Sequence, residues 1–218
     1  MSFFKRNHVA AVRALGLLMV LAMFGTAHAA VMAGKEYTQL NPPRPTETGK
    51  KIEVIEFFYY GCPHCFNLEP NLEAWRKKLP ADVSFRRVPG VFRDSWMPLT
   101  RLYYAYEALG LVDKLHADTF NAIHVDNIDL GTDKAIIDWV VKHGVDRNKF
   151  TAAFNSFAVQ NKAQRARVMT QQYGVQGVPT LVVDGKFMTS SGQAGGHDNV
   201  MAAVDELIAM ARAERKKR

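Results

Sequence analysis

The hydrophobic pattern of the chain predicts a strand–helix–strand segment between residues 52 and 88. Residues 52–60 are nearly all apolar, which predicts a central strand buried on both faces. After Gly61, apolar residues recur in steps of three and four, as on one face of a helix. Residues 83–88 predict a second strand, so the segment makes a βαβ unit with parallel strands. The apolar positions of the helix are Cys65, Leu68, Leu72, Trp75 and Leu79.

Residues 95–172 show helical periodicity throughout, with capping residues or glycines at most of the expected boundaries. We expect five helices in this stretch. Ser95, Thr132 and Asp146 are the expected N-caps of three of them, because their side chains can accept from free backbone N–H groups. A further helix is expected over residues 111–125, and the fifth ends at Tyr173-Gly174.

The chain closes with a second group of sheet-forming residues. Strand patterns at 180–183 and 186–189 flank Asp184-Gly185, a strong signal for a hairpin turn, and a last helix begins near Asp198. The order βαβ, helices, ββα predicts an α/β fold in which an all-helical domain is inserted into a split sheet domain. The expected parts are 30–93 and 168–218 for the sheet domain and 94–167 for the helical insertion.

The first 29 residues predict a secretory signal peptide. Lys5, Arg6 and Arg13 precede the apolar run 15–24, and Ala27-His28-Ala29 fits the small-x-small pattern that signal peptidase recognises. Cleavage after Ala29 would leave 189 of the 218 residues (218 − 29), which suits one domain with an insertion. The alternative is a retained membrane anchor, although the apolar run is short for a bilayer span.

Charge and cysteine content argue against several classes of protein. The net charge is +7, and it falls to about +4 after cleavage because the signal carries three basic residues and no acidic ones. Outside the C-terminal cluster 212–218 there is no basic stripe, so we expect no nucleic-acid binding. The chain has 2 cysteines. They close a loop of only four residues, which is too short to serve as a structural staple.

Cys62-Pro63-His64-Cys65 is the main candidate for chemistry, as a redox-active disulfide. Cys62 at the helix N-terminus is expected to be a stabilised thiolate and therefore the attacking sulfur. Pro63 suits the first helical turn, and His64 can add positive charge or a hydrogen bond. Cys65 faces inward and is expected to resolve mixed disulfides. We expect no metal, because zinc lacks a second pair of ligands, and no haem, because Phe66 stands where haem attachment needs histidine.

Two further positions are candidates. Glu56 lies in the middle of an apolar strand, where a carboxylate is costly unless it is paired or functional. We expect it beneath the disulfide, moving protons to and from Cys65 through a water. The alternative is a structural ion pair with Lys51 or Lys186. Val178-Pro179 opens the hairpin strand; an X–Pro bond can be cis, although trans is the default.

Together these motifs resemble the DsbA family of bacterial periplasmic oxidases, over nearly the whole chain after the signal. The resemblance implies a thioredoxin fold with a helical insertion. It also implies a cis bond before Pro179, close to the disulfide, and a groove for unfolded substrates around Gly177, Val178 and Pro179. The segments that carry the resemblance are Val54-Ile55-Glu56-Phe57-Phe58, Cys62-Pro63-His64-Cys65 and Gly177-Val178-Pro179.

The resemblance also implies the activity and the partners. We expect a monomeric periplasmic dithiol oxidase without a cofactor, which introduces disulfide bonds into exported proteins through Cys62 and Cys65. A DsbB-type membrane quinone reductase is expected to reoxidise it. Some members carry a second disulfide in the helical part, for which this chain has no cysteines. The alternatives are an isomerase or reductase, which the short lead-in before the first core strand disfavours, and a metallochaperone.

A last expectation concerns the stability of the two redox states. Closing a four-residue loop stabilises the oxidised state by about 1.9 kcal/mol. The Cys62 thiolate exists only in the reduced state, and it outweighs this contribution at pH 7 once its pKa is below roughly 5.6. We therefore expect the reduced protein to be the more stable one at neutral pH.

Overall fold

The structure, a computed structural model, describes residues 31–217 of the chain. The predicted signal peptide, with its cleavage site after Ala29, lies outside the described residues. Within residues 31–217, no helix combines the length and the apolar character needed to cross a membrane.

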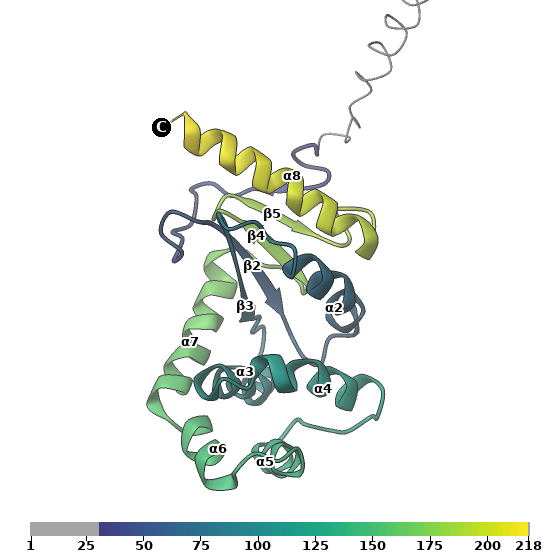
Figure 1. Cartoon of the computed structure of the whole chain (residues 1–218), viewed down its shortest axis with the longest axis vertical. Helices are drawn as coiled ribbons and strands as arrows, with labels where there is room; N and C mark the ends of the chain where they lie inside the picture. Colours follow the sequence, from purple (N-terminus) through teal and green to yellow (C-terminus); the bar gives the residue numbers. More distant parts are fainter. Residues whose placement is uncertain (1–30, 218) are drawn as a thin grey trace, which may run out of the picture. The chain divides into compact units, whose positions relative to one another are not determined.

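A five-stranded sheet forms the centre of the fold, with strand order β1-β5-β4-β2-β3 (Figure 1). β2 and β3 run parallel, whereas β4 is antiparallel to β2 and β5, and β1 is antiparallel to β5. The predicted βαβ unit and hairpin are therefore confirmed. The strands are β1 Thr38–Gln39, β2 Ile52–Phe58, β3 Val83–Pro89, β4 Thr180–Val183 and β5 Phe187–Ser190.

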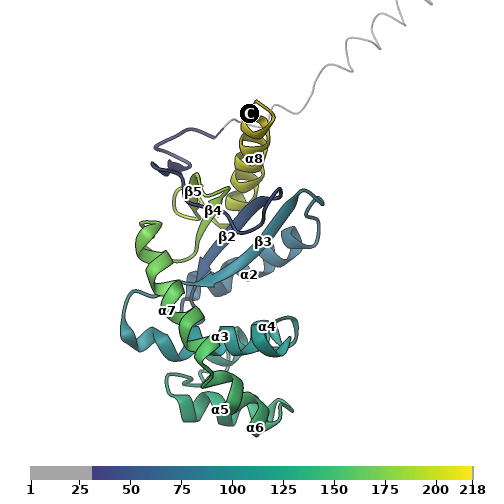
Figure 2. The ribbon, with the colours of Figure 1, turned by 90° about the vertical axis from the view of Figure 1, so that its left-hand side faces the viewer.

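The helices form two groups. α2 and α8 pack against each other and against the sheet, whereas α3 to α6 gather beyond the end of β2 and α7 runs back beside β3 (Figures 1 and 2). The insertion of helices between β3 and β4 is as predicted. The helices are α2 Pro63–Arg76, the 3₁₀ turn η1 Asp94–Trp96, α3 Met97–Leu109, α4 Val112–His124, α5 Asp133–Lys142, α6 Arg147–Phe154, α7 Phe157–Gln172 and α8 His197–Lys216.

Strand β2 is buried along its whole length, because its side chains alternate between two apolar cores. Ile52 and Val54 belong to the core shared with α2 and α8, whereas Ile55 and Phe57 belong to the core shared with the helical insertion. The strand therefore anchors both groups of helices. It leads directly into the turn that carries the two cysteines.

The structure corrects several details of the sequence analysis. Ser95 caps no helix; it lies in η1, and α3 begins two residues later at Met97. The Thr132 and Asp146 caps are confirmed, because their side chains accept from backbone N–H groups three residues on. The two-residue strand β1 was not predicted, since two exposed residues carry no hydrophobic alternation. The domain boundaries stay a prediction, and the one after residue 167 falls inside α7.

Candidate active site

The turn after β2 places the two cysteines at the start of α2. Cys62 is the N-cap residue of α2 and Pro63 its first residue, as predicted. The Cys62 N–H donates to the Tyr59 carbonyl at 3.0 Å, and the Cys62 carbonyl accepts from Cys65 N–H at 3.1 Å. Both side chains are thiols in this structure. Cys62 is partly exposed and Cys65 fully buried, which gives the two sulfurs different access to a substrate.

The two thiols also differ in acidity. The pKa of Cys62 is lowered to about 6, mainly by a hydrogen bond from the Cys65 thiol and further by backbone N–H groups at the helix start, although burial opposes this. The charge of the exposed His64 ring adds a smaller effect in the same direction. Burial raises the pKa of Cys65 well above its usual value, and the Glu56 carboxylate raises it further. At neutral pH the pair therefore combines an accessible thiolate with a buried thiol.

We predict that the thiolate absorbance of the reduced protein titrates with a midpoint at pH about 6. His64→Ala should raise this midpoint only slightly, because the stronger causes are the Cys65 thiol and backbone N–H groups. The measurement is ultraviolet absorbance of the reduced protein, with the oxidised protein as the blank that shows no transition. A midpoint near the free-thiol value of about 8.5 would contradict the assignment.

The same pKa revises the expectation about redox stability. A value of about 6 lies close to the threshold of roughly 5.6, so the two forms should have similar stability at pH 7. A depressed thiol pKa stabilises the reduced fold fully above the unfolded pKa of about 8.5, and this contribution is lost as the pH falls through about 6. Denaturant unfolding should therefore find the reduced form the more stable one at pH 8.5 and the oxidised form the more stable one at pH 5, with the order reversing near neutral pH.

The loop before β4 faces Cys62. The Val178–Pro179 bond is cis, which confirms the expectation drawn from the family resemblance. The Cys62 thiol donates to the Val178 carbonyl at 3.3 Å, and the Thr180 hydroxyl donates to the Gly177 carbonyl at 2.7 Å. The Val178 side chain packs where Gly90 leaves room, because a Cβ at Gly90 would lie 2.8 Å from Val178 Cγ1. The hydrogen bond with Cys62 is thus made by the residue before the proline.

A hollow of about 730 Å³ extends from this loop along the surface. Gly177, Val178 and Pro179 line it together with His64, so the structure brings the predicted substrate-binding residues next to the cysteine pair. The segment 190–197, between β5 and the start of α8, also lines it. The hollow is large enough for several side chains of an extended peptide.

An aromatic cluster beside the active-site turn was not predicted from the sequence. The Tyr59 and Trp96 rings stack at 3.8 Å between centroids, and Phe92, which is 43% exposed, meets Trp96 edge-on at 5.2 Å. Gly61 leaves room for Tyr59, because a Cβ there would lie 2.5 Å from the ring. These rings lie beside the active-site turn and are not part of the lining of the hollow.

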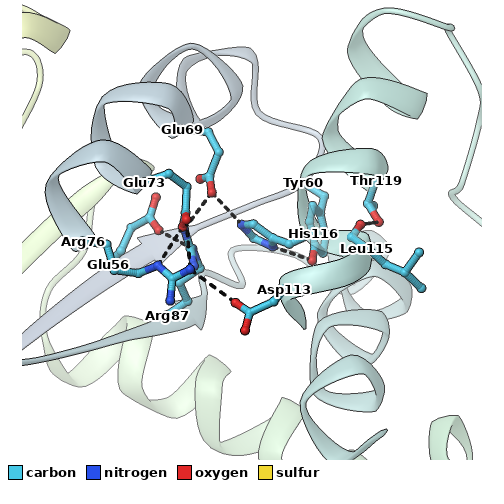
Figure 3. A network of polar contacts seen from close by, with 10 residues as sticks. All are labelled: Glu56, Tyr60, Glu69, Glu73, Arg76, Arg87, Asp113, Leu115, His116 and Thr119. Carbon is cyan, nitrogen blue, oxygen red and sulfur yellow. Dashed lines mark hydrogen bonds and ion pairs between the residues drawn. The ribbon is translucent and has the colours of Figure 1, made fainter. Parts of the chain in front are cut away.

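A buried ion cluster lies on the α2 side of β2 and centres on Arg87 of β3 (Figure 3). Arg87 donates from Nε to Glu56 at 3.1 Å, and from Nη2 to Glu69 and Glu73 at 2.7 Å each. His116 of α4 joins the cluster, with Nε2 at 3.2 Å from Glu69 Oε1. The alternative partners of Glu56, Lys51 and Lys186, are therefore not its partners: Lys186 pairs with Asp184 and Glu214.

Glu56 holds a proton at neutral pH. Burial raises its pKa to about 8, although the charge of Arg87 opposes the shift. One oxygen each of Glu56 and Glu69 is buried without a hydrogen-bond partner, as is His116 Nε2. A second hollow, of about 350 Å³, is lined by Glu69, Arg87 and His116. The cluster therefore has both a proton and polar atoms free to meet water.

Sequence reasoning found Glu56 but missed the rest of this cluster. Arg87 lies in the predicted strand 83–88, and Glu69 and His116 lie on two separate helices, so no local pattern connects them with Glu56. The signal that could have found Arg87 is the parallel register of β2 and β3, which places it opposite Glu56.

Comparison with known proteins identifies relatives over most of the chain. Residues 87–205 match the family model described as a DSBA-like thioredoxin domain. The chain is 39% identical over 203 residues to the thiol:disulfide interchange protein DsbA of Pseudomonas aeruginosa, covering 92% of this chain and 96% of that protein. The Burkholderia cepacia DsbA is 40% identical over 195 residues, covering 89% and 91%. The crystal structure of Pseudomonas aeruginosa DsbA matches with a TM-score of 0.82 and 40% identity, covering 85% of this chain and 97% of that one.

Proposed function

The chain belongs to the DsbA family and is a thiol:disulfide oxidoreductase of thioredoxin fold, and from this premise we propose that it is a periplasmic dithiol oxidase for exported proteins. The observation that carries the proposal is the asymmetric cysteine pair. The pKa of Cys62 is lowered to about 6 and that of the buried Cys65 is raised, so the reduced state is a thiolate and a thiol. A low thiol pKa makes Cys62 a good leaving group, which favours transfer of the disulfide to a substrate.

In the first step a substrate thiolate attacks the Cys62 sulfur of the oxidised protein. A substrate–Cys62 disulfide forms, the Cys62–Cys65 bond breaks, and its electron pair stays on Cys65 Sγ. A buried thiolate at Cys65 is costly, and the protonated Glu56 beside it supplies the proton through a water. Glu56 recovers its proton from solvent, and the hollow lined by Glu69 and His116 offers the route.

In the second step another substrate thiolate attacks the substrate sulfur of the mixed disulfide. The substrate disulfide forms, and the electron pair of the broken bond leaves on Cys62, whose lowered pKa stabilises the thiolate. His64, with its charge near Cys62, and Pro63, which starts the helix, support this state. The hollow beside Gly177, Val178 and Pro179 holds the substrate chain during both steps.

The reduced protein must lose two electrons before another cycle. We propose that a DsbB-type membrane quinone reductase accepts them, and that export through the predicted signal peptide places both proteins in the periplasm. The protein acts as a monomer in this scheme, because the described site is complete within one chain.

The proposed function is tested by oxidation of a reduced, unfolded protein that has several cysteines. The oxidised chain should remove the substrate thiols in stoichiometric amounts, and catalytically once a chemical oxidant regenerates it. Equilibration with glutathione should show a disulfide that glutathione reduces readily, since a stabilised thiolate favours the reduced state. A disulfide that stays oxidised against excess reduced glutathione would contradict the oxidase role and favour a reductase.

Glu56→Gln should slow substrate oxidation by at least about tenfold at pH 7, because glutamine fills the same space but cannot give a proton to Cys65. The wild-type rate should fall as the pH rises through about 8, where Glu56 loses its proton, whereas the variant should lack this step. The measurement is a pH profile of the single-turnover rate of thiol loss.

Glu53→Gln is the matched control for this prediction. Glu53 is buried in the same strand, but it bonds Arg86 and lies outside the Arg87 cluster. Its substitution should leave the pH profile unchanged. An unchanged rate and profile in Glu56→Gln would make Glu56 a structural partner of Arg87.

A further inference from the structure

The large hollow beside Cys62 is lined almost entirely by uncharged side chains. Among the described residues that line it there is no Asp, Glu, Lys or Arg, and its titratable side chains are His64 and His197. Both are at least partly exposed. The groove is otherwise built from small and uncharged polar residues around the cis peptide bond. Any charge that a bound peptide meets along this lining therefore comes from two imidazole rings.

The structure holds His197 firmly at the end of the groove near the cysteines. It is the first residue of α8, and its Nδ1 lies 3.0 Å from the Ser191 hydroxyl. Its ring centroid lies 6.1 Å from that of His64, with the planes tilted by 31°. The Asn71 side-chain amide of α2 donates to the His197 carbonyl at 3.4 Å, which ties the start of α8 to the helix that carries Cys62.

We propose that His197 is a specificity-determining residue that favours substrates with an acidic side chain next to the reactive cysteine. This inference rests on the proposed oxidase function and names a substrate preference of the same site. Imidazole is the side chain whose charge can change in mildly acidic conditions, and a protonated ring at this position presents a positive charge to a bound peptide. A substrate carboxylate entering this groove then meets a positive charge on a ring that lies 6.1 Å from that of His64, two residues after Cys62.

The charged groups around His197 support this preference in the oxidised protein. His64 faces it from α2, the segment 190–196 adds no charge, and Asp198 on its own helix accepts from Asn71 at 3.1 Å. Cys62 carries no charge while it is in the disulfide, so it does not compete with the substrate for the imidazolium. Once the substrate is oxidised, the Cys62 thiolate attracts the same cation. The carboxylate is then held less tightly, which favours release of the product.

The test compares reduced two-cysteine peptides that differ only in Glu or Gln beside the first cysteine, on either side. For each protein the ratio of kcat/KM for the Glu peptide to that for the Gln peptide is measured. Dividing the wild-type ratio by that of His197→Gln cancels the intrinsic difference in thiol acidity between the peptides. For at least one side, we expect a quotient of about two to five at pH 5.5, the size of a partly exposed ion pair. It should approach one at pH 8, and also at pH 5.5 in high salt.

Two further variants make the test decisive. His197→Lys keeps a cation at all relevant pH values, so its preference for the Glu peptide should persist at pH 8. His143→Gln is the matched control, because His143 lies against Trp139 and does not line the groove; it should behave as the wild type. A quotient of one at pH 5.5 on both sides of the cysteine overturns the proposal. Failure to oxidise either peptide would instead count against the oxidase function itself.

Discussion

Cys62→Ser should reduce the oxidation of substrate thiols to the uncatalysed background, a loss of at least about a thousandfold. Cys62 is the sulfur with the lowered pKa and the exposed position, and it lies against the Val178 carbonyl at the mouth of the groove. The remaining Cys65 is fully buried and its pKa is raised, so it cannot take over as the nucleophile or as the site of attack.

Cys65→Ser should behave in the opposite way when both variants react with a peptide carrying an activated mixed disulfide. Its Cys62 thiolate should attack the peptide rapidly and form a mixed disulfide that persists, because no second sulfur resolves it. Cys62→Ser should react slower by several orders of magnitude. The measurements are release of the leaving thiol and the mass of the protein–peptide adduct. Rapid adduct formation by Cys62→Ser, with none by Cys65→Ser, would reverse the assigned roles.

Features that depend on neighbouring residues could be predicted from the sequence. The buried strand before Gly61, the cysteine pair at a helix start and the Asp184-Gly185 hairpin each follow from a few consecutive positions, and all are present in the structure. Two of the three expected N-caps in the insertion, Thr132 and Asp146, likewise depend on local hydrogen bonds. Ser95 failed because the chain forms a 3₁₀ turn there before α3 begins.

Features that depend on distant residues could not be predicted. Arg87, Glu69 and His116 belong to a strand and two helices, and only the packing of α2 on β3 and of α4 against α2 brings them together. The Tyr59–Trp96 stack likewise needs the chain to return to the active-site turn after β3. The role proposed for His197 also depends on tertiary contacts, since nothing in the sequence places the start of α8 beside His64. Local patterns located the redox pair, whereas its surroundings arise from tertiary contacts.

Arg87→Met should lower the free energy of unfolding by about 3–5 kcal/mol at pH 8, because it leaves buried carboxylates without their cation. Arg87 is 6% exposed and donates to three carboxylates, two of which are themselves buried. Methionine fills similar space, so the loss reports the missing charge more than a cavity. Arg212→Met is the control: its exposed pair with Asp82 should be worth less than about 1 kcal/mol.

The pH dependence of this loss separates charge from packing. A carboxyl with a raised folded pKa favours folding at low pH, and the fold loses stability as the pH rises from the unfolded value towards the folded one. In the wild type, the pKa of Glu56 is already raised to about 8; removing Arg87 raises it further and also removes a cation that helps to hold the pKa of Glu73 at about 2. The deficit of Arg87→Met should therefore be larger at pH 9.5, where the wild-type Glu56 is ionised beside Arg87, than at pH 6, where Glu56 is protonated in both proteins. Urea unfolding at both pH values measures it. A deficit that does not change with pH would mean that Arg87 stabilises the fold by packing. The charge of Arg87 would then have no influence on the protonation of Glu56.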